Sequence, residues 1–291
     1  MIALLSTFVA TALSKEWWET ASFYQIYPQS FKDGGGGNLP GTGDLKGITD
    51  KLDYFKDLGI DCLWINPIFQ SSFGAFGYDI TNYTDIDPRY GSIESFETLI
   101  KSAHDKGIKV IVDFVPNHCG VNHEFFQKSI AKEAPYTDYF VWHAGKPNPS
   151  NANLNDPPSN WQRLGDGPGS AWNYDETRKE YFYALFYKNM PDLNLRNEEV
   201  VKYLESVMEF WMDRGVDGFR IDAISFGIEE SPDSVGNYAD ELINTMNITD
   251  PKDFGYLIHD KTQDLPELFQ LIYRWRKLLD NYKTKNGGDT R

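Results

Sequence analysis

The chain has 291 residues, of which 28 are basic and 43 acidic, so its formal net charge is −15 at pH 7. This acidic balance argues against nucleic acid and anionic membrane surfaces as partners, because both would repel it. A chain of this length forms either one barrel-type domain or two smaller domains, with a substantial core in each case.

The segment 2–13 is apolar and rich in small residues, and it carries Ala10 and Ala12 in an A-x-A arrangement before Lys15. It is too short to cross a bilayer, so it does not predict a stable membrane span. The pattern instead predicts a secretory signal peptide over residues 1–14, and hence a secreted protein.

Two N-glycosylation sequons, at Asn82 and Asn247, fit a secreted glycoprotein. The chain has two cysteines, Cys62 and Cys119, and each lies within or just after a predicted strand. A disulfide would require their Cα atoms to lie within about 7 Å of each other. We therefore expect two buried or partly buried thiols.

The first predicted strand covers 23–27, where aromatic and β-branched residues precede a proline. A glycine-rich loop follows, and it contains Asp33, Asn38 and Asp44. Spaced carboxylate and amide oxygens of this kind can bind a calcium ion. A plain flexible loop explains the same pattern equally well.

The next two units each consist of a helix followed by an apolar strand. A helix is predicted over 47–58 and a strand over 60–65, then a helix over 92–106 and a strand over 108–115. Near-continuous apolar runs are typical of parallel strands that are buried on both faces. The stretch 73–80 between the units is rich in glycine and aromatic residues and predicts a strand-to-helix loop.

From 118 to about 191 the alternation of helices and strands is replaced by a long segment rich in Pro, Gly, Asn, Trp and Tyr. A loop of this length is usually functional or forms a small domain. The alternation then resumes with a helix over 198–214, a strand over 215–222 and a final helix over 266–282. Four strands, each followed by a helix, make half of an eightfold α/β barrel, and a doubly wound open sheet is the alternative.

In a barrel, functional side chains gather at the C-terminal ends of the strands. The polar residues at these positions are Asp79, Asp113, Asn117, His118, Arg220 and Asp222. Arg220 and Asp222 are two apart in a strand, so they share a face. The guanidinium favours the ionised carboxylate and can keep it ready as a nucleophile. A structural ion pair is the alternative for this stretch taken alone.

Four motifs together resemble the α-amylase family of glycoside hydrolases. Asp113-Phe-Val-Pro-Asn-His118 and Gly218-Phe-Arg-Ile-Asp-Ala223 resemble the family's signatures for strands three and four. Phe76-Gly-Tyr-Asp79 and Met190-Pro-Asp-Leu-Asn194 are similar to its α-glucosidase branch, especially the insect-type maltases and sucrases. The resemblance covers essentially the whole chain after the signal peptide.

The resemblance implies an α/β fold, a partial (β/α)8 TIM barrel with strands one to four and their helices. The first part of the barrel would cover 15–117, and a small domain inserted after strand three would cover 118–190. The barrel would continue through helix four over 191–291 and stop before strand five.

Further residues take their expected roles from the resemblance alone. Asp79 and His118 match groups that hydrogen-bond the glucose in the reacting subsite, and Tyr78 matches its aromatic platform. Phe186 is expected to pack against the sugar. Asn117 is similar to the residue that supports this shell or, in the true amylases, a calcium ion.

For the reaction itself, Asp222 matches the nucleophile that forms a β-glucosyl-enzyme, and Arg220 matches the residue that keeps it ionised. A retaining glycosidase also needs a second carboxyl group, about 5 Å away, as acid and base. In the family this group lies at the end of strand five, and neither Glu267 nor Asp289 matches its motif.

Two departures from the family's pattern matter. The loop from Asp33 to Asp44 is longer than the branch's calcium loop and lacks its central acids, so the resemblance does not support calcium there, and no cofactor is required. Met190 stands where Gln is commoner, and the residues after Asp222 also differ. Both positions border the leaving-group subsites, so the leaving group is not assigned.

The leading hypothesis is the N-terminal half of a secreted, retaining α-glucosidase that acts on small α-glucosides such as maltose or sucrose. On this hypothesis the chain alone has little or no activity. The alternative is a non-catalytic sugar- or partner-binding relative, comparable to amino-acid-transporter heavy subunits. The sequence indicates no oligomeric state.

Overall fold

The computed structural model describes residues 15–151, 155–246, 248–251 and 253–286. The predicted signal peptide and the sequon at Asn247 lie outside these residues. Within the described ranges, no helix has both the length and the apolar character needed to cross a membrane.

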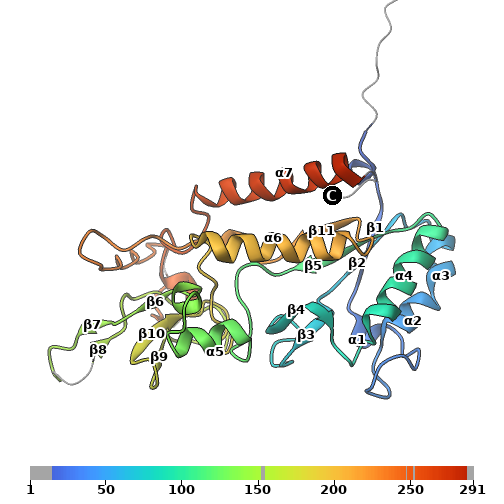
Figure 1. Cartoon of the computed structure of the whole chain (residues 1–291). Coiled ribbons are helices and arrows are strands. Elements are labelled where there is room, and N and C mark those ends of the chain that lie inside the picture. The colour runs from blue at the N-terminus through green and yellow to red at the C-terminus, as the bar shows by residue number, and fades with distance from the viewer. Residues whose placement is uncertain (1–14, 152–154, 247, 252, 287–291) are drawn as a thin grey trace, which may run out of the picture.

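Four parallel strands form the central sheet, in the order β1 (Phe23–Ile26), β2 (Cys62–Ile65), β5 (Lys109–Phe114) and β11 (Gly218–Ile221) (Figure 1). Their order in space is their order in the chain, which is the winding of a barrel and differs from that of a doubly wound sheet. The four predicted strands are confirmed, although each is shorter than its apolar run.

Three long helices accompany the sheet, namely α4 (Ile93–Asp105), α6 (Glu198–Met212) and α7 (Leu268–Asn286). Ser92 and Asn197 cap α4 and α6, because their side chains accept backbone N–H groups of the first turn. Figure 1 shows α7 beside α6. These three helices confirm the predicted ones, and α7 begins and ends later than expected.

The prediction of a single helix over 47–58 is wrong. The chain forms two short helices there, α2 (Leu45–Thr49) and α3 (Leu52–Asp57). The Asp44 side chain caps α2, so this helix begins at Leu45, two residues before the predicted start. Lys51, with φ −110° and ψ 11°, interrupts the helical backbone between α2 and α3. The apolar spacing continues across this break, which is why periodicity alone did not reveal it.

The structure also contains an antiparallel pair that the sequence did not predict, β3 (Phe69–Ser71) and β4 (Ile80–Ile86). The stretch 73–80 is mainly the connection between these two strands. In β4 every third residue is buried instead of every second. Strand prediction relies on a period of two, so this pattern gave no strand signal.

Between β5 and α6 lies the inserted segment, which we define as residues 118–190. Its regular elements are α5 (Glu124–Ile130), β6 (Trp142–His143), β7 (Lys146–Pro147), β8 (Asn155–Asp156), β9 (Trp172–Asp175) and β10 (Glu180–Tyr183). The strands form an antiparallel sheet in the order β6-β10-β9 and a separate pair, β7 with β8.

A second apolar cluster lies in the inserted segment, around Trp161, Trp172 and Tyr183. Tyr238 and Phe254 pack against it, although both follow β11 in the chain. The Trp161 indole N–H also donates to the backbone of this later segment, at 2.9 Å. The stretch after β11 therefore folds onto the inserted segment, a contact that no sequence signal indicated.

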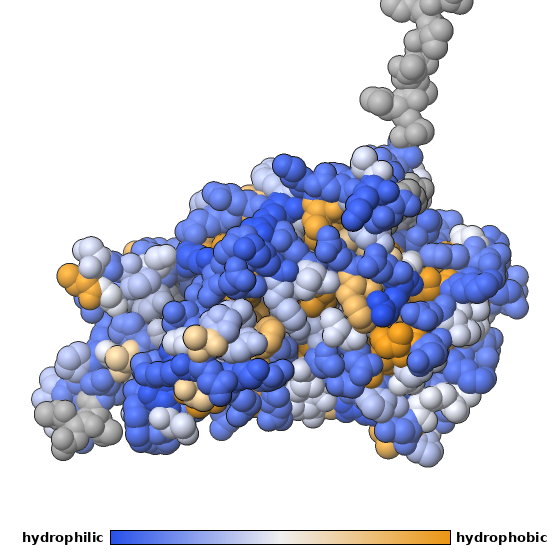
Figure 2. All heavy atoms as spheres, viewed as in Figure 1, coloured by the Kyte–Doolittle hydropathy of each residue, from blue (hydrophilic) through white to orange (hydrophobic). Residues whose placement is uncertain are grey.

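The remaining elements are short. They are α1 (Pro28–Phe31) and four single-turn helices at Trp17–Glu19, Tyr136–Asp138, Ile224–Phe226 and Phe254–Tyr256. Figure 2 shows that the surface in view is hydrophilic over most of its area, with hydrophobic residues exposed in small separate places. The apolar core is thus largely covered on this face.

The two cysteines are buried and unpaired, as expected. Asn82 is half-buried in β4, and its amide donates to the Gln70 side chain at 3.4 Å. Its carbonyl oxygen accepts from the Thr84 hydroxyl at 3.0 Å. A glycan at Asn82 would have to replace the contact with Gln70.

The glycine-rich loop after α1 is organised by one buried carboxylate. Asp44 accepts four backbone N–H groups at 2.7–3.1 Å, from Gly34, Gly36, Gly37 and Gly47. Burial alone would raise the pKa of Asp44, but these hydrogen bonds hold it below its usual value. The exposed Asp33 accepts two further N–H groups. Both carboxylates therefore have a structural role in the loop.

We predict that Asp44→Asn destabilises the fold by about 2–3 kcal/mol, because the amide removes a charged acceptor and turns an N–H group toward the loop's own donors. Urea unfolding measures this loss. The matched variant Asp33→Asn, at an exposed position, should cost less than about 1 kcal/mol. The Asp44 contribution should also fade in acid, as the pH falls through the lowered pKa. Equal losses in the two variants would contradict this account of the loop.

Candidate active site

The site begins where β5 and β11 end side by side. Arg220 is paired in register with Asp113, and its guanidinium lies 3.6 Å from that carboxylate. The same guanidinium nitrogen, Nη1, donates to Asp222. The predicted shared face is therefore confirmed, and the arginine lies between two carboxylates.

The charge of Asp222 is governed by two opposing influences. Burial raises the pKa of Asp222, and the charge and hydrogen bond of Arg220 lower it, yet the pKa stays above its ordinary value. The sequence predicted only the second influence. The structure adds that the carboxylate is partly desolvated, with 17% of its side chain exposed.

Asp113 is the residue whose importance the sequence understated. Its carboxylate is fully buried and accepts from the Trp64 indole at 2.6 Å and from the Tyr78 hydroxyl at 2.8 Å. Burial raises the pKa of Asp113 to about 6, against the lowering effect of these donors and of Arg220. Asp113 thus positions an arginine and a tyrosine of the site. The sequence signal that could have indicated this role is an acidic residue at the end of an apolar strand.

The loop between β3 and β4 supplies Tyr78 and Asp79. The Tyr78 hydroxyl also accepts from the Asn66 amide at 3.1 Å, so its ring is fixed from two sides. Asp79 is fully buried, and its Oδ2 accepts the Gly74 N–H at 2.8 Å. Its Oδ1 makes no hydrogen bond. Burial raises the pKa of Asp79.

His118 lies at the start of the inserted segment and is almost completely buried. The Asn117 amide lies 3.2 Å from its Nδ1, and its Nε2 has no hydrogen-bond partner. Burial lowers the pKa of His118 to about 3, so the ring is neutral at physiological pH. Its ring centroid is 5.2 Å from that of Phe186.

One pocket brings most of these predicted residues together. It has a volume of about 210 Å³ and is lined by Ala75, Phe76, Tyr78, His118, Phe186, Tyr187, Met190 and Asp222. Arg220 contacts the Asp222 carboxylate, and Asp79 follows Tyr78 directly. Phe76 and Tyr187 had not been assigned to the site from the sequence. Asp33 and Asp44 do not line this pocket.

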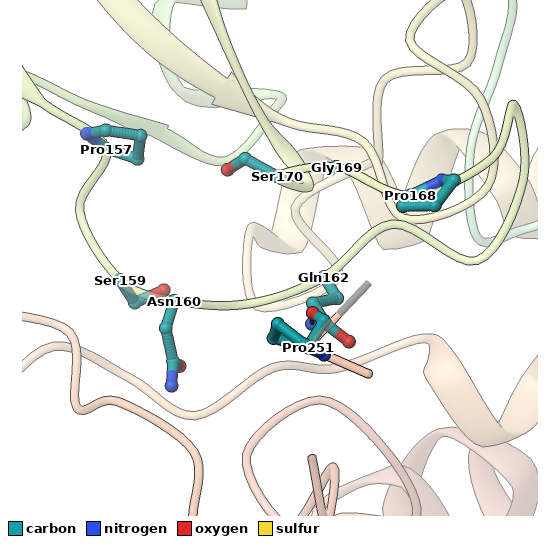
Figure 3. Close-up of a pocket in the computed structure, with 8 residues that line it drawn as sticks. All are labelled: Pro157, Ser159, Asn160, Gln162, Pro168, Gly169, Ser170 and Pro251. Carbon is teal, nitrogen blue, oxygen red and sulfur yellow. Dashed lines mark hydrogen bonds between the residues drawn. The ribbon is translucent and has the colours of Figure 1, made fainter. Parts of the chain in front are cut away.

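A larger hollow of about 550 Å³ lies elsewhere, where the inserted segment meets the stretch after β11. Figure 3 shows Asn160 and Gln162 beside Pro251 there. The Gln162 amide donates to the Pro251 carbonyl at 2.6 Å. None of the described residues that line this hollow is titratable. The smaller pocket is the candidate active site because it contains Asp222 together with Tyr78 and His118.

Buried oxygen atoms without partners occur beside the site. Asn117 donates to Asp192 at 3.2 Å, while Asn117 Oδ1 and Glu229 Oε1 accept no hydrogen bond. Burial raises the pKa of Glu229 to about 7, and burial and the Glu229 charge raise that of Asp192. Over the described ranges, no three His, Cys, Asp or Glu side chains come together as metal ligands. The donor chemistry of these oxygens fits calcium, which would neutralise the two carboxylates when bound.

Known proteins with similar sequences and structures indicate the family of the chain. A family model described as alpha amylase, catalytic domain, matches residues 25–288. Maltase A2 of Drosophila melanogaster is 45% identical over 290 residues, covering 100% of this chain and 50% of that protein. The salivary alpha-glucosidase of Aedes aegypti is 44% identical over 93% of this chain and 45% of its own length.

Among solved structures, the alpha-glucosyl transfer enzyme XgtA aligns with a TM-score of 0.82 and 37% sequence identity. The alignment covers 92% of this chain and 48% of that one. The chain therefore spans about half the length of the curated relatives it matches.

We predict that His118 makes the fold sensitive to acid. An unfolded histidine takes up a proton near pH 6.5, whereas the folded pKa of His118 is about 3, so stability is lost as the pH falls between these values. Between pH 7 and pH 5 the loss from this residue is about 2 kcal/mol. In His118→Gln, urea unfolding should show a correspondingly smaller difference between the two pH values. An unchanged difference would mean that His118 is not buried in its neutral form.

Proposed function

The chain belongs to the α-amylase family of glycoside hydrolases, and on that premise we propose that the whole protein is a secreted, retaining α-glucosidase. It removes terminal glucose from small α-glucosides such as maltose or sucrose. The observation that carries the proposal is the pocket in which a partly buried carboxylate, Asp222, lines the same space as Tyr78, His118 and Phe186.

Asp222 acts as the nucleophile in this proposal. Its carboxylate attacks the anomeric carbon and forms a glucosyl ester while the bond to the leaving group breaks. Arg220 holds the carboxylate by a hydrogen bond and keeps an opposite charge beside it. Asp222 must be ionised to attack. Because its pKa is raised, activity should be lost in acid at a higher pH than with an ordinary aspartate.

The terminal glucose is held by the surrounding groups. The rings of Tyr78 and Phe186 offer apolar faces to the sugar's C–H groups. Asp79 has a free acceptor, Oδ1, for a sugar hydroxyl, and the unpartnered Nε2 of the neutral His118 can hydrogen-bond another. Such a constellation favours a chain end over the interior of a long polysaccharide.

The mechanism also requires a carboxyl group that protonates the leaving oxygen and then activates water. Both oxygens of the Asp113 carboxylate already accept hydrogen bonds, from Trp64 and Tyr78, so it is not available to the substrate. We assign the acid to the second half of the barrel, in agreement with the twofold greater length of the relatives. The segment 1–14 serves as the signal peptide in this proposal.

We predict that an activated, fluorinated glucosyl fluoride labels Asp222 in the 291-residue chain. Fluoride leaves without protonation, so the attack does not need the acid group, and the glucosyl ester can be located by peptide mass spectrometry. Asp222→Asn should take up no label, because an amide is not a competent nucleophile. Label on Asp79 or Asp113 would show that the nucleophile is misplaced. A folded chain that takes up no label would support the non-catalytic alternative.

We also predict exo-acting hydrolysis in a protein that contains the complete barrel. Such a protein can be made by continuing this chain with the corresponding second half of the Drosophila maltase that it matches. Maltotriose and soluble starch should both yield free glucose, with no early fall in starch chain length. The same fusion carrying Asp222→Asn serves as the inactive control. Internal starch cleavage with little glucose would refute the exo-acting assignment.

A further inference from the structure

The loop that leads to Tyr78 and Asp79 has an unusual backbone. Phe73 and Phe76 have φ values of 59° and 56°, and Gly77 has 97°. The left-handed region suits glycine, but a bulky aromatic residue adopts it only under strain. Two phenylalanines in this conformation within four residues therefore need a reason.

Packing supplies a reason for Phe73 but not for Phe76. The Arg89 guanidinium lies 3.7 Å from the centre of the Phe73 ring, which is half-buried. The Phe76 residue is 67% exposed. Over the described ranges its ring has neither an aromatic neighbour nor a stacked cation. In the described part of the chain, the strained backbone at Phe76 therefore presents a largely exposed side chain, which gives the fold little apolar burial in return.

The conformation of this loop is tied to the pocket. The Gly74 N–H donates to Asp79 at 2.8 Å, and the Tyr78 N–H donates to the Ala75 carbonyl at 2.9 Å. These bonds close a tight turn with Phe76 between them. The ring consequently lines the same pocket as Asp222 and Tyr78.

We propose that Phe76 determines specificity for the leaving group, by stacking its ring on the ring of the group that departs. The inference rests on the proposed glucosidase function and names the class of leaving group. Tyr78, His118 and Phe186 account for the terminal glucose, whereas an exposed ring in the pocket's lining is available to whatever projects from it toward solvent. A pyranose ring or an aryl group offers an apolar face of the right kind, and a methyl group does not.

Equilibrium binding separates this role from a structural one. Calorimetry on the fusion that contains the complete barrel, carrying Asp222→Asn to prevent turnover, would use four ligands: glucose, methyl α-glucoside, maltose and 4-nitrophenyl α-glucoside. The last two carry a ring as leaving group, one a sugar and the other an aryl ring. Their affinities are compared with and without the additional change Phe76→Ala.

Loss of the ring should weaken the binding of maltose and of the aryl glucoside about five- to tenfold, which is the usual contribution of one stacked ring to affinity. Glucose and methyl α-glucoside should bind with unchanged affinity. Phe76→Tyr should retain the affinity of the parent fusion, because the ring face is kept. Tyr174→Ala, which removes another exposed ring in the inserted segment, should change none of the four affinities.

A second variant tests the reason for the strain. Phe76→Gly suits the positive φ, so its thermal midpoint should equal or exceed that of the parent fusion while the ring-bearing ligands bind more weakly. A lower midpoint, equal weakening of all four ligands, or no change in any of them would each overturn the proposal. Failure of the parent fusion to bind even glucose would instead refute the glucosidase function on which it rests.

Discussion

The guanidinium of Arg220, held between Asp113 and Asp222, is the interaction on which the site depends. It exists only because β5 and β11 are paired so that Arg220 lies opposite Asp113. A shift of one residue in this register would turn the arginine to the other face of the sheet and leave Asp113 buried without its counter-charge. Val110, Val112 and Phe114 of β5 are buried, and Phe219 and Ile221 of β11 are partly buried. These apolar residues therefore fix the electrostatics of the pocket as well as the fold.

Strand pairing alone does not complete the pocket, because its other walls come from loops. Tyr78 enters through the β3–β4 connection and reaches the sheet by donating to Asp113. Phe186 comes from the inserted segment, where it contacts the ring of His118 on one side and that of Phe226, beyond β11, on the other. The inserted segment is also held by the stretch after β11 through Trp161. A rigid sheet thus provides the charges, and separate loops provide the apolar surfaces.

Much of this arrangement could be predicted from the sequence, because apolar runs mark buried parallel strands and polar residues at their ends share one edge. Those rules predicted that Asp222 and His118 lie at the same end of the sheet, and both residues line the pocket. They could not give the net effect of burial on the Asp222 pKa, since desolvation depends on neighbours distant in sequence. Nor could they give the docking of Tyr238 on the inserted segment, or the exposure of Phe76, because local patterns contain no information about tertiary contacts or their absence.

The Asp113 carboxylate accepts hydrogen bonds from Trp64 and Tyr78 and forms an ion pair with Arg220, and this network has an evolutionary consequence. A change at any one of these positions leaves a buried polar group without its partner, so its effect depends on the residues at the other three. Substitutions that are harmful singly become tolerable only in combination. The four residues therefore form one epistatic unit, and descendants of this chain would be expected to retain them all or to replace them together.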